Sequence, residues 1–264
     1  MYTKSDHTFV ICAYKDNPYL EQTMISVTTQ TVQSHVMLST STPSDYIENL
    51  CKKYDIEYVI NPNGKGAGND WNYGYDHAKT KLVTIVHQDD FYEKDYLKEV
   101  LEYANNTDDM LIGFTDYYEL RNGQKVSDLK ILKIKRVMNY LFKFSYFKKV
   151  KWYRKRMLAF GDCISCPTVV LNKEKLGNSI FDTSMKNSCD YITWVNIAFM
   201  EGQFFYIPKL LVGHRIYEES ATTRNIADNS RRNEDLEIMC KLWPSFIAKI
   251  IHKLYIKSED SNQL

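Results

Sequence analysis

One stretch of the chain, residues 82–90, constrains its fold more than any other. The apolar and β-branched run Leu82–Val86 is followed within three residues by two adjacent carboxylates, Asp89 and Asp90. A continuous run of this kind is typical of a parallel strand that is buried on both faces. Because open α/β sheets bind ligands at the carboxyl ends of their strands, we expect both carboxylates in a solvent-facing crevice.

Two carboxylates at such a place offer the hard oxygen ligands that Mg²⁺ or Mn²⁺ prefers. A divalent cation held there could neutralise the diphosphate of a nucleotide substrate. A solvated loop after a strand is the competing interpretation, and the acidic pair alone does not decide between the two. The neighbouring segments are therefore needed to choose between a metal site and a solvated loop.

Strands and helices alternate through the first 115 residues. Apolar patterns predict strands near 8–13, 36–39, 56–60, 82–86 and 110–114, with helices between them at about 19–29, 45–54, 70–79 and 93–104 and a glycine-rich loop at 61–69. Such alternation predicts an α/β fold with a doubly wound, mostly parallel sheet. The second half is expected to add a strand before residue 171, a helix at 190–201, a strand at 204–207, helices at 236–242 and 246–256, and a disordered acidic tail.

Composition fits a single large domain. The chain has 264 residues, 44% of them hydrophobic, which is enough for a full-sized core. No apolar run reaches the roughly 18 residues that span a bilayer, and the polar start lacks the apolar stretch of a signal peptide, so we expect a cytoplasmic protein. The six cysteines are then expected as reduced thiols. Cys163 and Cys166 form a lone CxxC, which favours core cysteines over a zinc site.

A net charge of +1 hides a strong asymmetry. Residues 130–156 contain eleven of the 34 basic residues and no acidic residue. The rest of the chain therefore contains 23 basic and all 33 acidic residues. Apolar residues recur in this segment at helical spacing beside the basic ones, a pattern that suits an anionic membrane surface. A solvated helix face and a nucleic-acid patch are the alternatives; we favour the membrane and expect no nucleic-acid partner.

Five short motifs along the chain carry a resemblance to a known family. In order they are Phe9–Leu20, Ser26-Val27 with Gln30-Thr31, Asn72-Tyr73-Gly74 with Ala78, Asp89-Asp90, and Phe181-Asp182 followed by Asp190 and Trp194. None is decisive alone. Their order and spacing resemble the family 2 glycosyltransferases over about residues 7 to 223, of the inverting type that builds bacterial surface polysaccharides.

The resemblance implies a single GT-A domain over residues 1–223. Its first half, 1–115, would bind a nucleotide-sugar, and its second half, 116–223, which includes the basic segment, would bind an acceptor. Residues 224–264 would be a helical extension that ends in the tail.

The resemblance also implies roles for the acidic residues. Asp90 would coordinate Mn²⁺ or Mg²⁺ bridging the donor diphosphate, and Asp89 would hold the ribose or the donor sugar. Asp190 is similar to the family's acceptor-side base, which takes the proton of the attacking hydroxyl. A helix N-cap is a simpler role for Asp190, compatible with the first. The remaining donor contacts are expected from Ala13, Tyr14, Ser39, Lys65, Asn72 and Gln88.

Several positions depart from the family's pattern. The Asp-x-Ser-x-Asp that usually follows the second strand is replaced by Ser39-Thr40-Ser41-Thr42-Pro43, so Tyr14 could instead pack on the base. Trp71 stands where an Arg is common, and Lys65 is expected to supply the cationic contact.

Two residues of the second half, His214 and Trp194, each have two possible roles. The segment from His214 to Tyr217, with Ser220 and Thr222, resembles a Tyr-Arg-x-His-x-x-Ser segment with His and Tyr exchanged. His214 would either be a metal or phosphate partner or an ordinary strand-end histidine. Trp194 fits the core better than a sugar platform.

These features predict a metal-dependent hexosyltransferase at the inner face of the cell membrane. It would move a sugar from a nucleotide-diphosphate sugar, expected to be a UDP-sugar, to a hydroxyl of a lipid-linked or nascent cell-surface glycan. A nucleotidyltransferase is one alternative, although its glycine-rich loop should directly follow the first strand. A non-catalytic carbohydrate- or membrane-binding module is another, against which Asp89, Asp90 and Asp190 argue.

Overall fold

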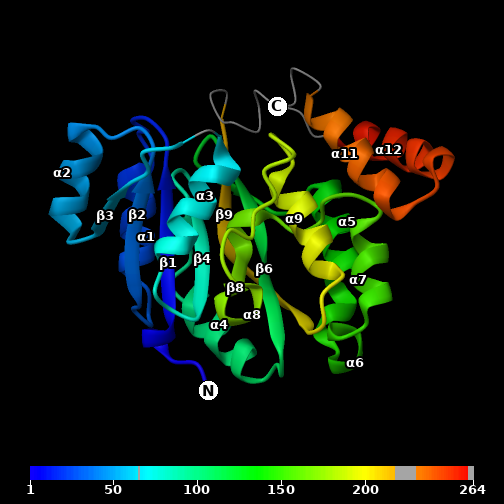
Figure 1. The fold of residues 1–264 in the computed structure, drawn as a ribbon, viewed down its shortest axis with the longest axis horizontal. Helices are drawn as coiled ribbons and strands as arrows, with labels where there is room; N and C mark the ends of the chain where they lie inside the picture. Colours follow the sequence, from blue (N-terminus) through cyan, green and yellow to red (C-terminus); the bar gives the residue numbers. More distant parts are fainter. Residues whose placement is uncertain (65, 218–229, 261–264) are drawn as a thin grey trace.

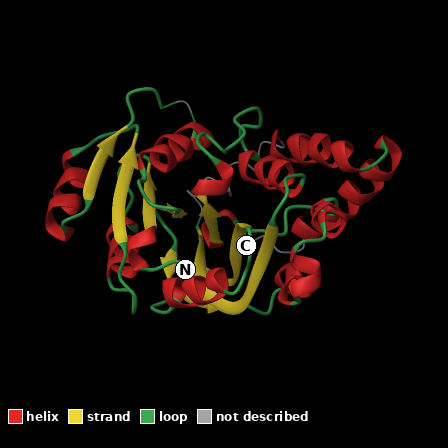
Figure 2. Cartoon of the chain, turned by 60° about the horizontal axis from the view of Figure 1, so that its bottom comes forward, coloured by secondary structure: helices red, strands yellow, loops and turns green. Residues whose placement is uncertain are grey.

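A nine-stranded sheet forms the centre of the molecule, and helices cover both of its faces (Figures 1 and 2). This computed structural model describes residues 1–64, 66–217 and 230–260. Lys65, Ser220 and Thr222, which the sequence singles out, lie outside the described residues, as do residues 261–264. The expectation of a disordered tail after residue 256 is wrong for residues 257–260, because the last helix continues to Asp260.

The strands are β1 (His7–Ala13), β2 (His35–Thr40), β3 (Glu57–Ile60), β4 (Leu82–His87), β5 (Phe91–Tyr92), β6 (Met110–Arg121), β7 (Gln124–Val126), β8 (Val169–Asn172) and β9 (Gln203–Ile216). Each strand predicted from the sequence is present. β6 and β9 are longer than predicted because they pair with each other beyond their apolar centres, through Arg121 and Ile216. The two short strands β5 and β7 were not predicted.

The α-helices are α1 (Leu20–Thr28), α2 (Asp45–Tyr54), α3 (Ala67–His77), α4 (Tyr96–Asn105), α5 (Lys130–Asn139), α6 (Ser145–Lys148), α7 (Lys151–Leu158), α8 (Lys173–Leu176), α9 (Cys189–Ala198), α11 (Ser230–Leu242) and α12 (Ser245–Asp260), with short 3-10 helices at Lys4–Asp6, Tyr140–Lys143 and Cys166–Thr168. Ser44 caps α2, since its hydroxyl accepts the Ile47 N–H. None of the described helices combines the length and the apolarity needed to cross a bilayer.

The strand order is β3-β2-β1-β4-β8-β6-β9-β5, with β7 beside β6. The first four strands in this order are parallel, β8 is antiparallel to both of its neighbours, and β6 and β9 are parallel. The carboxyl ends of β1, β2 and β4 therefore meet at one edge, where Ala13 pairs with Thr40 and Cys12 with His87. The predicted mostly parallel α/β sheet is confirmed.

Close packing of α3 on the sheet explains the glycine of the Asn-x-Gly motif. A Cβ on Gly74 would lie 2.6 Å from Cγ1 of Val10 and 3.1 Å from Cβ of Ser39, so only glycine lets the helix approach β1 and β2 this closely. On the same side of the sheet Trp194 of α9 is fully buried against Phe181, which confirms its predicted place in the core.

Helix α11 is part of this core. Ile238 of α11 is fully buried in the same apolar cluster as Trp194, and the carboxylate of Glu234 accepts backbone N–H groups at residues 186 to 188, just before α9. All six cysteines are free, and Cys163 and Cys166 are buried in that cluster, as expected of core thiols.

Candidate active site

Asp90 follows the end of β4, but its side chain does not face solvent. The residue is 1% exposed and its N–H bonds back to the carbonyl of His87, which turns the carboxylate into the interior. The expectation of a solvent-facing position for Asp90 is wrong, because strand β9 covers it. The hydroxyl of Thr23 donates to the carbonyls of Gln88 and Asp90 and holds this turn against α1.

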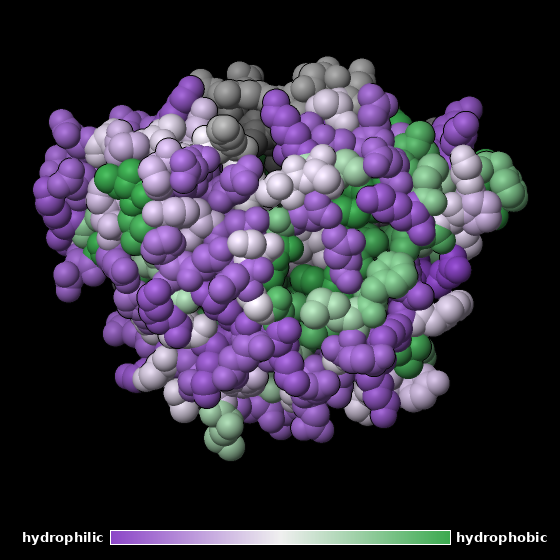
Figure 3. Space-filling model, viewed as in Figure 1, coloured by the Kyte–Doolittle hydropathy of each residue, from purple (hydrophilic) through white to green (hydrophobic). Residues whose placement is uncertain are grey.

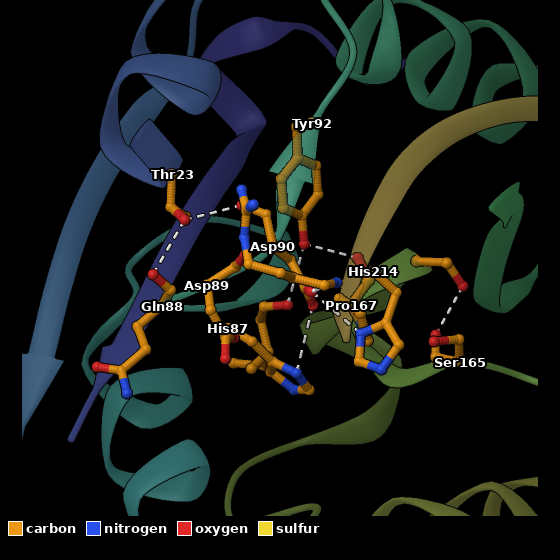
Figure 4. A network of polar contacts seen from close by, with 12 residues as sticks. Thr23, His87, Gln88, Asp89, Asp90, Tyr92, Ser165, Pro167 and His214 are labelled. Carbon is orange, nitrogen blue, oxygen red and sulfur yellow. Dashed lines mark hydrogen bonds and ion pairs between the residues drawn. The ribbon is translucent and has the colours of Figure 1, made fainter. Parts of the chain in front are cut away.

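Strand β9 brings His214 onto the acidic pair (Figure 4), and Arg215 follows it in the same strand. Nδ1 of His214 lies 3.0 Å from Oδ1 of Asp90, and the backbone N–H of Arg215 donates to the same oxygen at 3.0 Å. The guanidinium of Arg215 donates to the carbonyl of Asp89 at 2.8 Å and stacks on Tyr19 at 4.0 Å. Residues more than 120 positions apart therefore build one site.

His214 and Asp90 form a buried ion pair. Burial alone would raise the pKa of the Asp90 carboxyl, but the charge and the hydrogen bond of His214 outweigh it and hold that pKa below its usual range. In turn Asp90 raises the pKa of His214 against the effect of burial. Of the two alternatives for His214, the structure has the side chain turned into the site.

Asp89 is the more accessible carboxylate of the pair. It is partly exposed, and the hydroxyl of Tyr217 donates to its Oδ2 at 2.8 Å. Burial and the neighbouring charge of Asp90 raise its pKa. Tyr217 is itself held by the amide of Asn17, at 3.0 Å.

Tyr14 and Gln88 lie together at the mouth of the site. The amide of Gln88 accepts the N–H of Tyr14 at 2.9 Å and donates to its carbonyl at 3.1 Å, so Gln88 fixes the backbone after β1. The Tyr14 side chain is 55% exposed, while Ala13 is buried. Of these three, Tyr14 has the side chain available to a ligand.

Two predicted donor contacts are used differently in the structure. Both ends of the Asn72 amide bond the backbone of Phe181, each at 2.8 Å, so Asn72 joins α3 to the Phe-Asp motif. Ser39 is 1% exposed beneath Gly74. Direct donor contact through Ser39 would require α3 to leave the sheet, so its place beneath the helix argues against that role.

The residues that follow Ser39 form a polar cluster at the same sheet edge. The hydroxyl of Ser41 and the amide of Asn61 each donate to the carboxylate of Asp70 at 2.8 Å. Asp70 thus places a carboxylate next to the β2 end, where the family's Asp-x-Ser-x-Asp is missing.

Asp190 lies in the first turn of α9. The helix N-cap is Ser188, so the expectation of an N-cap role for Asp190 is wrong. Its half-buried carboxylate accepts the N–H of Tyr191 at 2.9 Å. A Cβ on Gly68 would lie 3.4 Å from Cβ of Cys189, which puts the start of α9 beside the start of α3. Asp190 therefore lies next to the sheet edge that carries the acidic pair.

The acidic pair has the donor atoms that a divalent cation uses. Oδ2 of Asp90 has no hydrogen-bond partner among the described residues, and the nearest ring nitrogen, Nδ1 of His87, is 3.5 Å away. With the partly exposed Asp89 this is a carboxylate oxygen set suited to Mg²⁺ or Mn²⁺. Residues 1–64, 66–217 and 230–260 contain no group of three or more His, Cys, Asp or Glu side chains arranged around a metal position.

Sequence reasoning did not assign roles to several residues of this site. His87 stacks on Trp71, with ring centres 5.1 Å apart, and Thr23, Arg215 and Tyr217 hold the acidic pair. Arg215 and Tyr217 had a signal in the sequence, because both belong to the segment from His214 to Tyr217 that resembles a motif of the family. Thr23 and His87 had none, because only the folded chain brings them together.

The order of the strands, with the covering helices, is that of a GT-A glycosyltransferase domain. The chain belongs to the family described as glycosyl transferase family 2, whose model matches residues 8–170. A search of curated proteins finds no match.

Solved structures share the fold at low sequence identity. S. aureus TarS 1-349 has a TM-score of 0.65 and 14% identity, with 98% of this chain and 72% of that chain covered. The same protein in complex with UDP-GlcNAc has a TM-score of 0.67, with 14% identity and 98% and 73% covered. Mannosyltransferase PcManGT from Pyrobaculum calidifontis, in complex with GDP-Man and Mn²⁺, has a TM-score of 0.63 and 14% identity, with 95% and 69% covered.

Proposed function

We propose that this protein is an inverting glycosyltransferase that moves a sugar from a nucleotide-diphosphate sugar to a hydroxyl of a lipid-linked or nascent cell-surface glycan. One observation carries the proposal: the acidic pair after β4 lies at the same sheet edge as Asp190, a carboxylate used by no side chain of the described residues as a hydrogen-bond or ion-pair partner. The acidic pair would then act on the donor, and Asp190 would act on the acceptor.

Asp190 is the proposed general base. Its carboxylate takes the proton of the acceptor hydroxyl while the oxygen attacks the anomeric carbon from the face opposite the diphosphate, which inverts that carbon. Asp89 and Tyr14 hold the donor, Asp89 through its accessible oxygen and Tyr14 through its exposed ring. Arg215 and Thr23 are positioning residues, because they bond the backbone of the acidic turn.

Asp89 and Asp90 are the residues that would hold Mn²⁺ or Mg²⁺, while His214, predicted from the sequence as a possible ligand, is ion-paired with Asp90 and would position that carboxylate. A divalent cation there would act as a Lewis acid on the negative charge of the departing diphosphate. Oδ2 of Asp90, which accepts no hydrogen bond from the described residues, supports this assignment.

A UDP-sugar is the proposed donor, and TarS in complex with UDP-GlcNAc supports it by similarity of fold. PcManGT, in complex with GDP-Man, has a similar fold, so the base needs a direct test. We propose to measure hydrolysis of a panel of UDP-, GDP- and dTDP-sugars with and without Mn²⁺. Release of one nucleoside diphosphate, stimulated by Mn²⁺, is the expected result.

The same panel, extended by nucleoside triphosphates with a sugar phosphate, separates the alternatives. A nucleotidyltransferase would release pyrophosphate from a nucleoside triphosphate and a sugar phosphate, and the β1–α1 connection, residues 14–19, contains no glycine for its phosphate loop. A non-catalytic module would bind a nucleotide-sugar or a glycan without turnover. Either outcome would contradict the proposed transfer.

We also propose that the basic segment, residues 130–156, attaches the protein to the inner face of the cell membrane. Fewer of its charges are free than the sequence suggests, because six of the eleven bond other protein groups: Lys135, Arg136, Lys148, Lys151, Arg154 and Arg156. Two of these six charges are compensated by carboxylates, Arg136 by Asp116 and Lys151 by Glu201, and the other four bond neutral oxygens. Trp152 remains 65% exposed beside the free charges and suits a membrane interface.

Vesicle cosedimentation tests the attachment. Replacing the exposed residues Lys130, Lys133, Lys143 and Lys149 by Gln should weaken binding to anionic vesicles, since each basic group near the surface contributes about 1 kcal/mol. The matched control replaces exposed lysines elsewhere: Lys52, Lys79, Lys94 and Lys98. Equal loss in both variants, or equal binding of the wild type to neutral and anionic vesicles, would contradict the assignment.

A further inference from the structure

An apolar cavity of 380 Å³ lies between α5, α12 and the turn that follows α7. Its walls include Ile131, Ile134 and Met138 from α5, Ile251 and Leu254 from α12, and Phe160 from the turn. A volume of this size falls within the range of about 300–1,000 Å³ that ligand pockets occupy. The proposed donor site uses none of these residues.

The cavity has a polar side that borders the proposed acceptor base. Asp162 and Lys135 line it, and both are held in place: Lys135 donates to the hydroxyl of Tyr117 at 3.2 Å, and Nη2 of Arg231 lies 3.8 Å from Oδ2 of Asp162. Burial, with the nearby charge of Asp190, raises the pKa of the Asp162 carboxyl to about 7. The hydroxyl of Tyr191, the residue after Asp190, donates to the carbonyl of Leu158 at the end of α7, so the start of α9 packs against the element that leads into the polar side of the cavity.

Helix α12 turns an apolar stripe to solvent beside this cavity. Phe246, Ile250 and Leu254 recur every fourth residue and are 68%, 61% and 65% exposed. Lys249 and Lys253 are exposed on the same face of the helix. Figure 3 shows hydrophobic residues at the surface over α12 and beside α7 and α9, on the right-hand side of the molecule. Leu254 belongs to both the stripe and the cavity wall, so the two are continuous.

The position of α12 is fixed by contacts at its start. Trp243, just before the helix, donates its indole N–H to the carbonyl of Ala159 at 2.8 Å, and the guanidinium of Arg156 stacks on the Trp243 ring at 4.2 Å. Arg156 also donates to the carbonyl of Leu242. The buried side of α12 includes Ala248 and His252. A helix anchored on one side with an apolar stripe on the other has a face without a partner in this chain's described residues.

We propose that the cavity binds the hydrocarbon chain of a membrane lipid whose head group carries the acceptor hydroxyl, with the α12 stripe lying in the bilayer interface around it. The head group would face Asp162 and Asp190, and the chain would pass along the apolar walls toward Leu254. This inference rests on the proposed function and deepens it, since it names the acceptor as a lipid and gives its orientation.

The side chains on the exposed face of α12 favour a membrane lipid as the ligand. Lysines interleaved with large apolar residues on one exposed helix face match an interface of hydrocarbon and anionic head groups. Lys130 and Lys133 of α5 are exposed on the helix that forms the opposite wall. The apolar walls offer no hydrogen-bond groups to a peptide backbone, whereas a hydrocarbon chain needs none.

Alkyl glucosides test the cavity on the full-length protein. Binding of methyl, hexyl, octyl and decyl glucoside is measured by calorimetry below their critical micelle concentrations. Affinity should rise with chain length by up to about fourfold per methylene, the factor for one fully buried CH₂ group. Ile134→Trp, which fills the cavity, and Leu254→Asp, which places a charge in its wall, should each remove most of this dependence.

Ile25→Asp is the matched control, because Ile25 is an exposed apolar residue of α1 far along the chain from the cavity. It should retain the chain-length dependence, and thermal unfolding of all three variants reports whether they fold. Affinity that is independent of chain length in the wild type, or a dependence that persists in both cavity variants, would overturn the proposal. A dimer in lipid-free buffer that Leu254→Asp dissociates would assign the stripe to a second copy and overturn it as well.

Donor hydrolysis separates this inference from the proposed function. The two cavity variants should hydrolyse the nucleotide-sugar without acceptor at the wild-type rate. If the wild type binds long-chain glucosides but releases no nucleoside diphosphate from any sugar donor, the glycosyltransferase proposal fails while the lipid cavity stands. If the wild type releases a nucleoside diphosphate but its affinity for glucosides does not depend on chain length, the glycosyltransferase proposal stands and the lipid cavity fails.

Discussion

The two adjacent carboxylates after β4 differ in their surroundings and should respond differently to the same substitution. Asp89 is partly exposed, so Asp89→Asn should abolish the metal-dependent part of nucleotide binding with little loss of stability. Asp90 is buried against His214 and the Arg215 N–H, so Asp90→Asn should also lower the free energy of unfolding by about 1–3 kcal/mol. Calorimetry with UDP and Mn²⁺, and thermal unfolding, check the two effects.

A nucleotide affinity that responds to Mn²⁺ equally in the wild type and in both variants would contradict the assignment of Asp89 and Asp90 as metal ligands.

Asp190 should contribute to turnover and not to donor binding. Asp190→Asn keeps the size of the side chain but removes the proton acceptor, so we expect turnover to fall by about 10²-fold or more. Nucleotide affinity should stay within about twofold. Measurement of sugar transfer to an acceptor, beside calorimetry with the nucleotide alone, separates the two. Near-normal transfer by this variant would show that the proton goes elsewhere.

At the scale of elements, the approach of α3 to the sheet should make one glycine indispensable. Gly74→Ala would force a methyl group to within 2.6 Å of Val10, and overpacking of this kind costs about 1–3 kcal/mol. Gly68→Ala, in the same helix, meets only the side chains of Thr183 and Cys189 at 3.3 and 3.4 Å and should be tolerated. Urea unfolding of the two variants checks the contrast, and equal stability would contradict the packing argument.

The buried charges that join α5, α9 and α11 should make stability depend on pH. The pKa of Asp162 is raised to about 7, mainly by burial and then by Asp190, so the folded protein keeps a proton that the unfolded chain releases near its ordinary pKa of 3.8. Stability should therefore fall as the pH rises from about 4 to about 7.

Asp162→Asn removes this titration. Its melting temperature should depend less on pH across that window than that of the wild type. Parallel curves for the two proteins would show that Asp162 does not hold its proton in the fold.

At the scale of the whole molecule, the C-terminal helices are expected to stabilise the domain. We predict that a chain ending at residue 223 melts well below the full chain, because it loses the buried residues Ile238 and Met239 and the bonds of Glu234 to the segment before α9. A chain ending at residue 260 is the control and should melt with the full chain. Unchanged melting of the shorter chain would instead support residues 224–264 as a separate extension.

Local patterns in the sequence determined most of the fold. Apolar runs and helical spacing predicted the strands β1 to β4 and the helices between them, because buried parallel strands need continuous apolar residues and each crossover needs a helix. The same patterns placed Asp89 and Asp90 at a strand end and Asp190 at the start of a helix. Resemblance to the family then related these carboxylates to one another.

Tertiary structure alone decided what each of those residues touches. Burial of Asp90 depends on β9, whose His214 and Arg215 lie more than 120 residues away, and no local pattern encodes that contact. Asn72 bonds Phe181, and Ser39 lies under Gly74, for the same reason. The sequence by itself determined which elements form and where the carboxylates fall along them, because those depend on neighbours in the chain. Which carboxylate is enclosed, which stays accessible and which charges are already paired depend on neighbours in space.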